Sequence, residues 1–215
     1  VKNILINNGV NVPIKVVGNG VDHYNDLVSK KINLPDAEYI FLHISSCFPR
    51  KGIDLLIKSY CEEFTHLDDV LLVIKTFKNP HNDIFKILNE NIYGKINAPK
   101  VFIIEDDLDP NEINYLYEVS HCFVAPSRAE GFGLPFAEAK LKGLKLITTA
   151  WGGALDFCNY DEDILIDYDF GISSSHLNLY ASVWAEPKFN ELKLAMRECF
   201  QKREPVSYTH LRAHE

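Results

Sequence analysis

Short runs of apolar, mostly β-branched residues alternate along the chain with longer segments in which apolar residues recur every three or four positions. The short runs predict strands at residues 14–17, 39–44, 70–77, 101–104, 122–125, 145–149 and 164–166. The periodic segments predict helices at residues 53–64, 83–92, 111–119, 135–142 and 189–201. Because strands that are apolar on both faces must be covered on both faces, the alternation predicts a doubly wound α/β domain around a parallel sheet.

The two ends of the chain do not fit this alternation. Residues 1–12 predict the end of a helix, with Val1, Ile4 and Leu5 on one face and Gly9 placed to stop it. Residues 206–215 resemble one reading frame of a sequencing adapter, so they are left out of fold reasoning, although an ordinary polar tail is the alternative. We therefore expect a gene fragment with one domain over residues 13–205.

Composition narrows the class of protein. With 47% hydrophobic and 12% aromatic residues, the 215 residues can form a packed core, which excludes a disordered chain and a coiled coil. No apolar run approaches the roughly 18 residues of a membrane helix, and a net charge of −8 argues against a nucleic-acid partner. Five widely spaced cysteines without a C-x-x-C motif indicate reduced, mostly buried thiols in a cytosolic protein.

Candidate chemistry follows the predicted strands, because ligands of open parallel sheets bind beyond the carboxyl ends of the strands. After strand 122–125 comes S-R-A-E-G-F-G-L-P-F-A-E, with Pro135 at a helix start. The free N–H groups of that helix start could hold a phosphate. Glu130 and Glu138 are expected to face one cleft, where carboxylates accept hydroxyl groups of a ribose or hexose. A capped helix with two solvated glutamates explains these residues equally well.

Two further segments carry cations. Arg50 and Lys51 lie at the start of the predicted helix 53–64, where they oppose the helix dipole unless an anion such as a diphosphate binds; a solvated basic loop is the alternative. Lys75 lies near the carboxyl end of the otherwise apolar strand 70–77, so it must enter a cleft or find a partner, or extend to the edge of the sheet. His43, inside another strand, is interpreted as a satisfied core residue. No cluster of His or Cys ligands suggests a metal.

Together these segments resemble retaining GT-B glycosyltransferases of family four, the glycosyl transferases group 1. Glu130 and Glu138, separated by seven residues in E-G-F-G-L-P-F-A-E, are similar to the family's paired glutamates. Residues 17–22, 48–57 and 151–156 are similar to its N-G-V-D turn, its K-G helix start and its G-G segment, and W-A-E-P at 184–187 resembles the closing segment of several members. The resemblance covers residues 1–203 and implies the Rossmann-like C-terminal half of a GT-B fold, which binds the donor.

The resemblance also implies roles for individual residues. Glu138 would bind the ribose hydroxyls, Glu130 would face the transferred sugar, and Lys51 would neutralise the diphosphate. Many members carry an arginine where this chain has Ser45, so we expect Lys75 or Arg50 to supply the second positive charge. Further donor contacts are implied for Gly131, Phe132, Gly133 and Leu134, and for Asp107 and Leu108 beside the nucleobase.

The implied reaction transfers a hexose from a nucleotide-sugar to a glycan or lipid-linked glycan, with retention at the anomeric carbon and with no metal or other cofactor. The acceptor would be held by a missing N-terminal domain, so the fragment alone is expected to be inactive. We expect a cytoplasmic protein. The missing half would provide any peripheral association with the inner face of the membrane. The alternatives are a GT-B sugar-nucleotide epimerase or phosphorylase, and a non-catalytic nucleotide-binding α/β domain. Donor base, donor sugar, acceptor, linkage and oligomeric state are left open.

Overall fold

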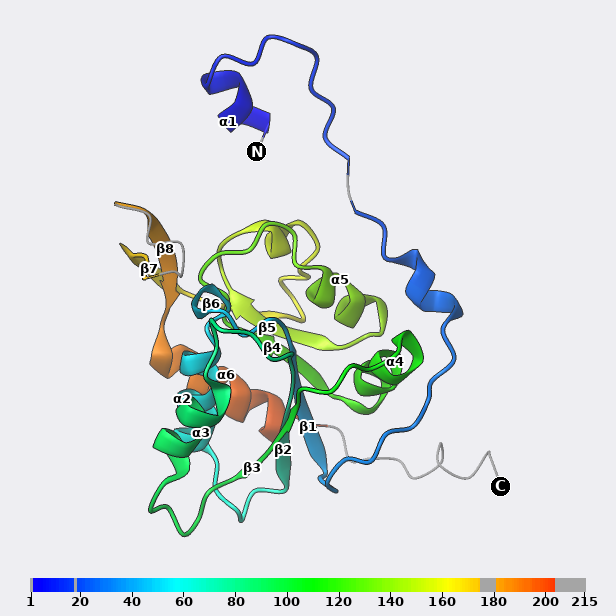
Figure 1. The fold of residues 1–215 in the computed structure, drawn as a ribbon, viewed down its shortest axis with the longest axis vertical. Coiled ribbons are helices and arrows are strands. Elements are labelled where there is room, and N and C mark those ends of the chain that lie inside the picture. Colours follow the sequence, from blue (N-terminus) through cyan, green and yellow to red (C-terminus); the bar gives the residue numbers. More distant parts are fainter. Residues whose placement is uncertain (1, 18, 175–180, 204–215) are drawn as a thin grey trace.

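The computed structural model describes residues 2–17, 19–174 and 181–203, and a parallel six-stranded sheet forms its centre (Figure 1). The strand order is β3-β2-β1-β4-β5-β6, and every neighbouring pair is parallel. The strands are β1 (Tyr39–Ile44), β2 (Val70–Lys75), β3 (Lys100–Ile104), β4 (Cys122–Ala125), β5 (Lys145–Thr149) and β6 (Ile164–Ile166). All six lie where the apolar runs predicted them, although β2 ends two residues earlier.

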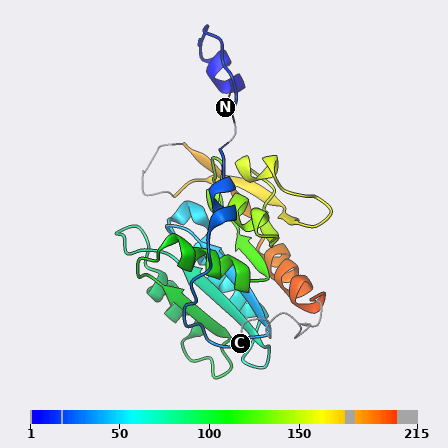
Figure 2. The same ribbon diagram turned by 90° about the vertical axis from the view of Figure 1, so that its right-hand side faces the viewer.

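Helices cover both faces of the sheet, as Figure 2 shows from the side. One face packs against α2 (Ile53–Glu63), α3 (Ile84–Ile92) and α6 (Phe189–Gln201). The other packs against α4 (Pro110–Val119) and α5 (Leu134–Leu141). Each helix lies within one residue of its predicted ends. Local signals set these ends: α4 begins with a capping box in which Asp109 and Glu112 bond each other's backbone N–H groups.

The sheet has one point where its winding reverses. The connection after β1 leads to α2 on one face, and the connection after β4 leads to α5 on the other, while β1 and β4 are neighbours. This is the topological switch point of a doubly wound fold, beyond which ligands bind. The predicted Rossmann-like architecture is therefore confirmed.

Two parts of the chain differ from the predicted elements. The strand predicted at 14–17 is wrong: Val16 and Val17 are exposed, and among the residues that the structure describes no strand pairs with this run. A β-branched run becomes a strand only when a neighbour accepts its hydrogen bonds. An antiparallel hairpin of β7 (Tyr168–Ile172) and β8 (Val183–Pro187) was not predicted. The adapter-like residues 206–215 lie outside the described residues.

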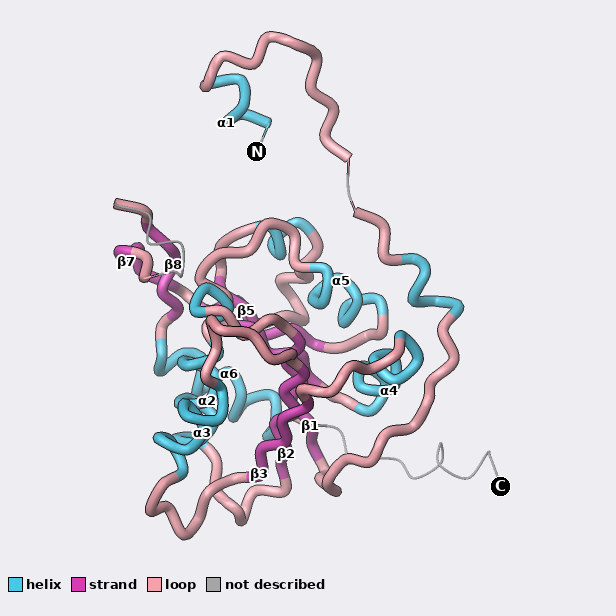
Figure 3. Tube along the Cα trace, in the orientation of Figure 1, coloured by secondary structure: helices cyan, strands magenta, loops and turns pink. Residues whose placement is uncertain are grey.

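The first part of the N-terminal segment, with α1, runs apart from the layered domain (Figure 3). Helix α1 (Lys2–Asn7) has no buried residue and ends as predicted, because Gly9 and Val10 donate their N–H groups to carbonyl groups of its last turn. Farther along, the short 3₁₀ helix η1 (Asp22–Asp26) packs against α5. All five cysteines are free thiols, and four of them are buried.

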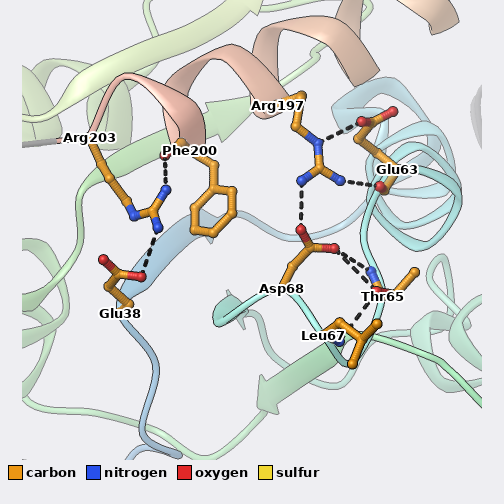
Figure 4. A network of polar contacts seen from close by, with 8 residues as sticks. All are labelled: Glu38, Glu63, Thr65, Leu67, Asp68, Arg197, Phe200 and Arg203. Carbon is orange, nitrogen blue, oxygen red and sulfur yellow. Dashed lines mark hydrogen bonds and ion pairs between the residues drawn. The ribbon is translucent and has the colours of Figure 1, made fainter.

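Two arginines anchor the last helix at the amino-terminal edge of the sheet (Figure 4). Arg197 donates to Glu63 at 2.8 Å and to Asp68 at 2.6 Å, which joins α6 to the end of α2 and the loop before β2. Arg203 donates to Glu38 at 2.9 Å, just before β1. These contacts fix the C-terminal helix at the amino-terminal ends of β1 and β2, which lie opposite the switch point.

Candidate functional site

The two loops that meet at the switch point are held together tightly. Gly52 ends the β1–α2 loop with φ = +69°, and a Cβ atom there would lie 2.1 Å from the carbonyl oxygen of Pro126 in the β4–α5 loop. Only glycine tolerates both this conformation and this approach. The loops also share hydrogen bonds: the Arg128 N–H donates to the Arg50 carbonyl at 2.8 Å, and the Arg50 side chain donates to the Ala129 carbonyl at 3.1 Å.

Lys51 and Glu130 form an ion pair between these loops, so the fold brings the two predicted catalytic residues into contact. Each side chain is only 11% exposed. The Arg50 guanidinium lies 3.6 Å from the same carboxylate oxygen of Glu130. Burial lowers the pKa of Lys51, and the nearby Glu130 carboxylate opposes that shift. The two cations therefore have a partner in the unliganded protein and do not form a solvated basic loop.

The predicted glycine-containing loop leads from Glu130 into α5. Gly133 precedes the helix, Leu134 is its first residue, and no side chain caps its first N–H groups. The loop rests on the segment after β5, because a Cβ atom on Gly153 would lie 1.8 Å from the carbonyl oxygen of Gly131. The Phe132 ring packs edge-on against Phe157, with centroids 5.3 Å apart. The uncapped N–H groups and the helix dipole give this position the chemistry of an anion site.

Glu138 lies in the second half of α5 and has partners of its own. The Tyr117 hydroxyl donates to Glu138 Oε2 at 2.8 Å, and Tyr24 of η1 also hydrogen-bonds this carboxylate. Burial raises the pKa of Glu138, and the two hydroxyl donors oppose that shift. The structure thus does not bring Glu138 into contact with Glu130. Sequence reasoning did not select Tyr24 or Tyr117, because nothing local links positions so far apart in the chain.

The other predicted donor residues lie on neighbouring loops. Lys75, at the end of β2, is buried and donates to the Thr76 carbonyl at 2.6 Å. Burial lowers its pKa, while Asp107 and Asp106 in the loop after β3 oppose that shift. Asp107 is exposed, and Leu108 is half-buried. Lys75 therefore lies beside the predicted base loop, whereas Arg50 lies beside Glu130.

His43 and Ser45 occupy the end of β1. His43 is fully buried, with Nδ1 2.7 Å from the Val124 carbonyl oxygen and Nε2 2.8 Å from Ser45 Oγ. Because a carbonyl only accepts, Nδ1 carries the proton and Nε2 accepts from the serine. The interpretation of His43 as a satisfied core residue is confirmed. Ser45, where the resemblance implied an arginine, donates its hydroxyl to His43 in this hydrogen-bond chain.

Arg128 is a site residue that sequence reasoning missed. Its buried guanidinium binds Asp54 in the first turn of α2 and Glu186 in β8. It also lies over the Trp184 ring at 4.9 Å. These residues line part of a cavity of about 490 Å³ between α2, α3 and the β7–β8 hairpin, which contains neither Lys51 nor Glu130. In the described part of the chain, no group of three His, Cys, Asp or Glu side chains could hold a metal ion.

Known proteins share this sequence pattern and this fold. The profile of the family described as "Glycosyl transferases group 1" matches residues 25–167. Sucrose-phosphate synthase 4 of Arabidopsis thaliana is 26% identical over 162 residues, which are 67% of this chain and 15% of that protein. Within the described residues, no helix is long and apolar enough to cross a membrane.

Two solved structures show the same architecture. The sucrose-phosphate synthase of Thermosynechococcus elongatus matches with a TM-score of 0.59 and 20% identity, over 79% of this chain and 38% of that one. Alr3699/HepE of Anabaena, solved in complex with UDP-glucose, matches with a TM-score of 0.52 and 20% identity, over 60% of this chain and 35% of that one. The chain thus spans about 15% of the curated relative and under two fifths of either solved protein.

Proposed function

Because the chain belongs to the glycosyl transferases group 1 family, we propose that it is the donor-binding half of a retaining hexosyltransferase. The observation that carries this proposal is the ion pair of Lys51 and Glu130 at the switch point, next to the uncapped start of α5. A cation and free N–H groups at one place suit a diphosphate. A carboxylate beside them suits the hydroxyl groups of a sugar.

Each part of the site then has a role in transfer. The nucleoside diphosphate leaves with growing negative charge, which Lys51, Arg50 and the first N–H groups of α5 would stabilise. Glu130 faces the transferred hexose, whose transition state has oxocarbenium character. Glu138 binds the ribose hydroxyls, which requires Tyr24 or Tyr117 to share or yield its carboxylate oxygens. Asp107 and Leu108 would contact the nucleobase, and Lys75, beside that loop, would supply a further positive charge.

The remaining parts of the proposal concern the whole enzyme. The acceptor, a glycan or lipid-linked glycan, would contact the other wall of the cleft, supplied by further chain. Charge stabilisation by fixed cations makes transfer independent of a metal ion. With one wall only, the 215 residues would bind donor without efficient turnover, because the acceptor is not positioned.

Nucleotide binding tests the proposal directly. Isothermal titration of the chain with UDP, GDP and ADP should give binding with at least one of them, and Glu138→Ala should abolish it. Glu90→Ala is the matched control, since Glu90 is an exposed glutamate on α3, on the other face of the sheet. If the chain binds none of the three nucleotides, the proposed donor site is contradicted.

Stereochemistry and metal dependence need a reacting donor. UDP-glucose is a suitable first probe, because a structural relative was solved with it. Slow hydrolysis of the bound donor, with water in place of the acceptor, should release the α-anomer first, and EDTA should not change the rate. NMR of the anomeric proton of the released sugar measures both the anomer formed and the rate of its release. Initial release of the β-anomer would overturn retention, and loss of the reaction in EDTA would overturn metal independence.

A further inference from the structure

The Arg128 guanidinium uses all five of its N–H donors. Nε and Nη2 donate to the two oxygens of Glu186 at 2.7 and 2.8 Å. Nη1 and Nη2 donate to the two oxygens of Asp54 at 2.7 and 2.8 Å, and Nη1 also donates to the Pro49 carbonyl at 2.7 Å. The side chain is 7% exposed. Because the five donors form a rigid planar fork, this set of partners fixes the guanidinium in one orientation.

The partners of Arg128 belong to the segments that carry the candidate catalytic pair. Pro49 begins the short helix η2 (Pro49–Lys51), which ends at Lys51, and Asp54 lies in the first turn of α2 directly after it. Arg128 itself lies two positions before Glu130. One side chain therefore joins the loop of Lys51 to the loop of Glu130, in addition to the backbone hydrogen bonds between them.

The β7–β8 hairpin supports this side chain from the outside. Glu186 of β8 binds it in a bidentate manner, and the Ala185 N–H donates to the Arg128 carbonyl at 3.0 Å. The Trp184 ring, only 8% exposed, covers the guanidinium at 4.9 Å. The hairpin therefore holds Arg128 by a bidentate ion pair, a backbone hydrogen bond and a cation–π contact.

We propose that Arg128 is a positioning residue that sets the separation of Lys51 and Glu130, and that the β7–β8 hairpin braces it through Glu186. This inference rests on the proposed function for its consequence, because the separation of these two groups matters where a diphosphate and a sugar bind between them. Arg128 touches neither Lys51 nor the Glu130 carboxylate in any contact that the structure shows. It acts through the Pro49 carbonyl and the backbone of its own loop.

Two variants and one control test the positioning role. Arg128→Lys keeps the charge but loses the fork, and Glu186→Gln keeps one acceptor while the side chain stays partly exposed. Asp169→Asn is the control, because Asp169 lies on the same hairpin but pairs with Lys188 and not with Arg128. Two measurements apply to each protein: the NMR titration of the Lys51 ammonium, and the ratio of affinities for a nucleoside diphosphate and its monophosphate.

Displacement of the loops should expose Lys51 to water, so its pKa should rise toward the ordinary value in both test variants. The diphosphate-to-monophosphate affinity ratio should fall by about tenfold in Arg128→Lys. The affinity for the monophosphate, which does not reach the second phosphate position, should stay within about twofold. A purely structural role would lower the melting temperature without changing this ratio. Asp169→Asn should change neither measurement.

The outcomes separate this inference from the proposed function. If both variants keep the Lys51 titration and the affinity ratio of the wild type, Arg128 is not a positioning residue, whatever happens to stability. If the wild type binds no nucleotide, the proposed donor site is overturned, and the Lys51 titration still decides whether Arg128 sets the ion pair. If Arg128→Lys does not fold, Glu186→Gln gives the answer, since it removes one acceptor at a position that is 40% exposed.

Discussion

Lys51 and Glu130 lie 79 positions apart in the sequence, and their side chains form an ion pair where the sheet reverses its winding. The Glu130 carboxylate neutralises the Lys51 ammonium, which would otherwise attract an incoming diphosphate. Two like charges, those of Glu130 and the diphosphate, then compete for Lys51 and Arg50. Binding of the proposed donor would therefore rearrange this pair, and mutation of each residue should then have its own effect on affinity.

Glu130→Gln should bind a nucleoside diphosphate about three- to tenfold more tightly than the wild type, because it removes a competing negative charge from Lys51. Sugar transfer by a complete enzyme with this change should fall by at least about a hundredfold. Lys51→Met should weaken the diphosphate by about tenfold or more. Isothermal titration measures all three affinities. Equal affinities in Glu130→Gln and the wild type would show that the pair does not compete with the ligand.

Glu138→Gln should stabilise the unliganded protein by roughly 0.5 kcal/mol at pH 8 while it weakens nucleotide binding. Burial raises the pKa of Glu138, so its charged form is less favourable in the folded than in the unfolded protein. The contribution to stability is therefore present below the unfolded pKa and lost as the pH rises through the folded one. Urea unfolding at pH 8 and pH 4 should show the gain of the variant only at pH 8. A gain of the same size at both values would exclude ionisation as its cause.

His43 should make the fold sensitive to mild acid. Burial lowers its pKa to about 4, against about 6.5 in an unfolded chain. A lowered histidine pKa means that stability is complete above the unfolded value and is lost as the pH falls toward the folded one. At pH 5 this amounts to roughly 2 kcal/mol. Urea unfolding at pH 7 and pH 5 should show that His43→Asn loses correspondingly less than the wild type; parallel losses would contradict the assignment.

Gly52→Ala should destabilise the protein by more than about 2 kcal/mol, because the new Cβ atom collides with the Pro126 carbonyl oxygen. Gly94→Ala is the matched control: Gly94 also has a positive φ, at +73°, but open space lies around its Cβ direction. That variant should lose only about 1 kcal/mol, the backbone cost alone. The difference between the two melting temperatures measures the close approach of the loops. No difference would mean that the loops can separate freely.

Local sequence patterns predicted the parts of the fold that depend on local chemistry. The six strands read as apolar runs because helices cover both faces of the sheet, and α4 is marked by its proline and its capping residues. The same rule failed at residues 14–17, an apolar run that has no neighbouring strand in the described part of the chain. It also missed the β7–β8 hairpin, in which exposed Phe170 and Ile172 alternate with Asp169 and Gly171. The sequence of one strand does not determine which other strand pairs with it.

The candidate site divides in the same way. The sequence by itself determined which residue types follow each strand, including Lys51, Glu130 and the start of α5, because helix starts and glycine turns are local features. Only the tertiary structure decided which of them meet. The five bonds of Arg128 reach residues 58 to 79 positions away, and the partners of Glu138 come from α4 and η1. Such contacts depend on how the strands order themselves in the sheet, and chain folding brings them together without any local signal in the sequence.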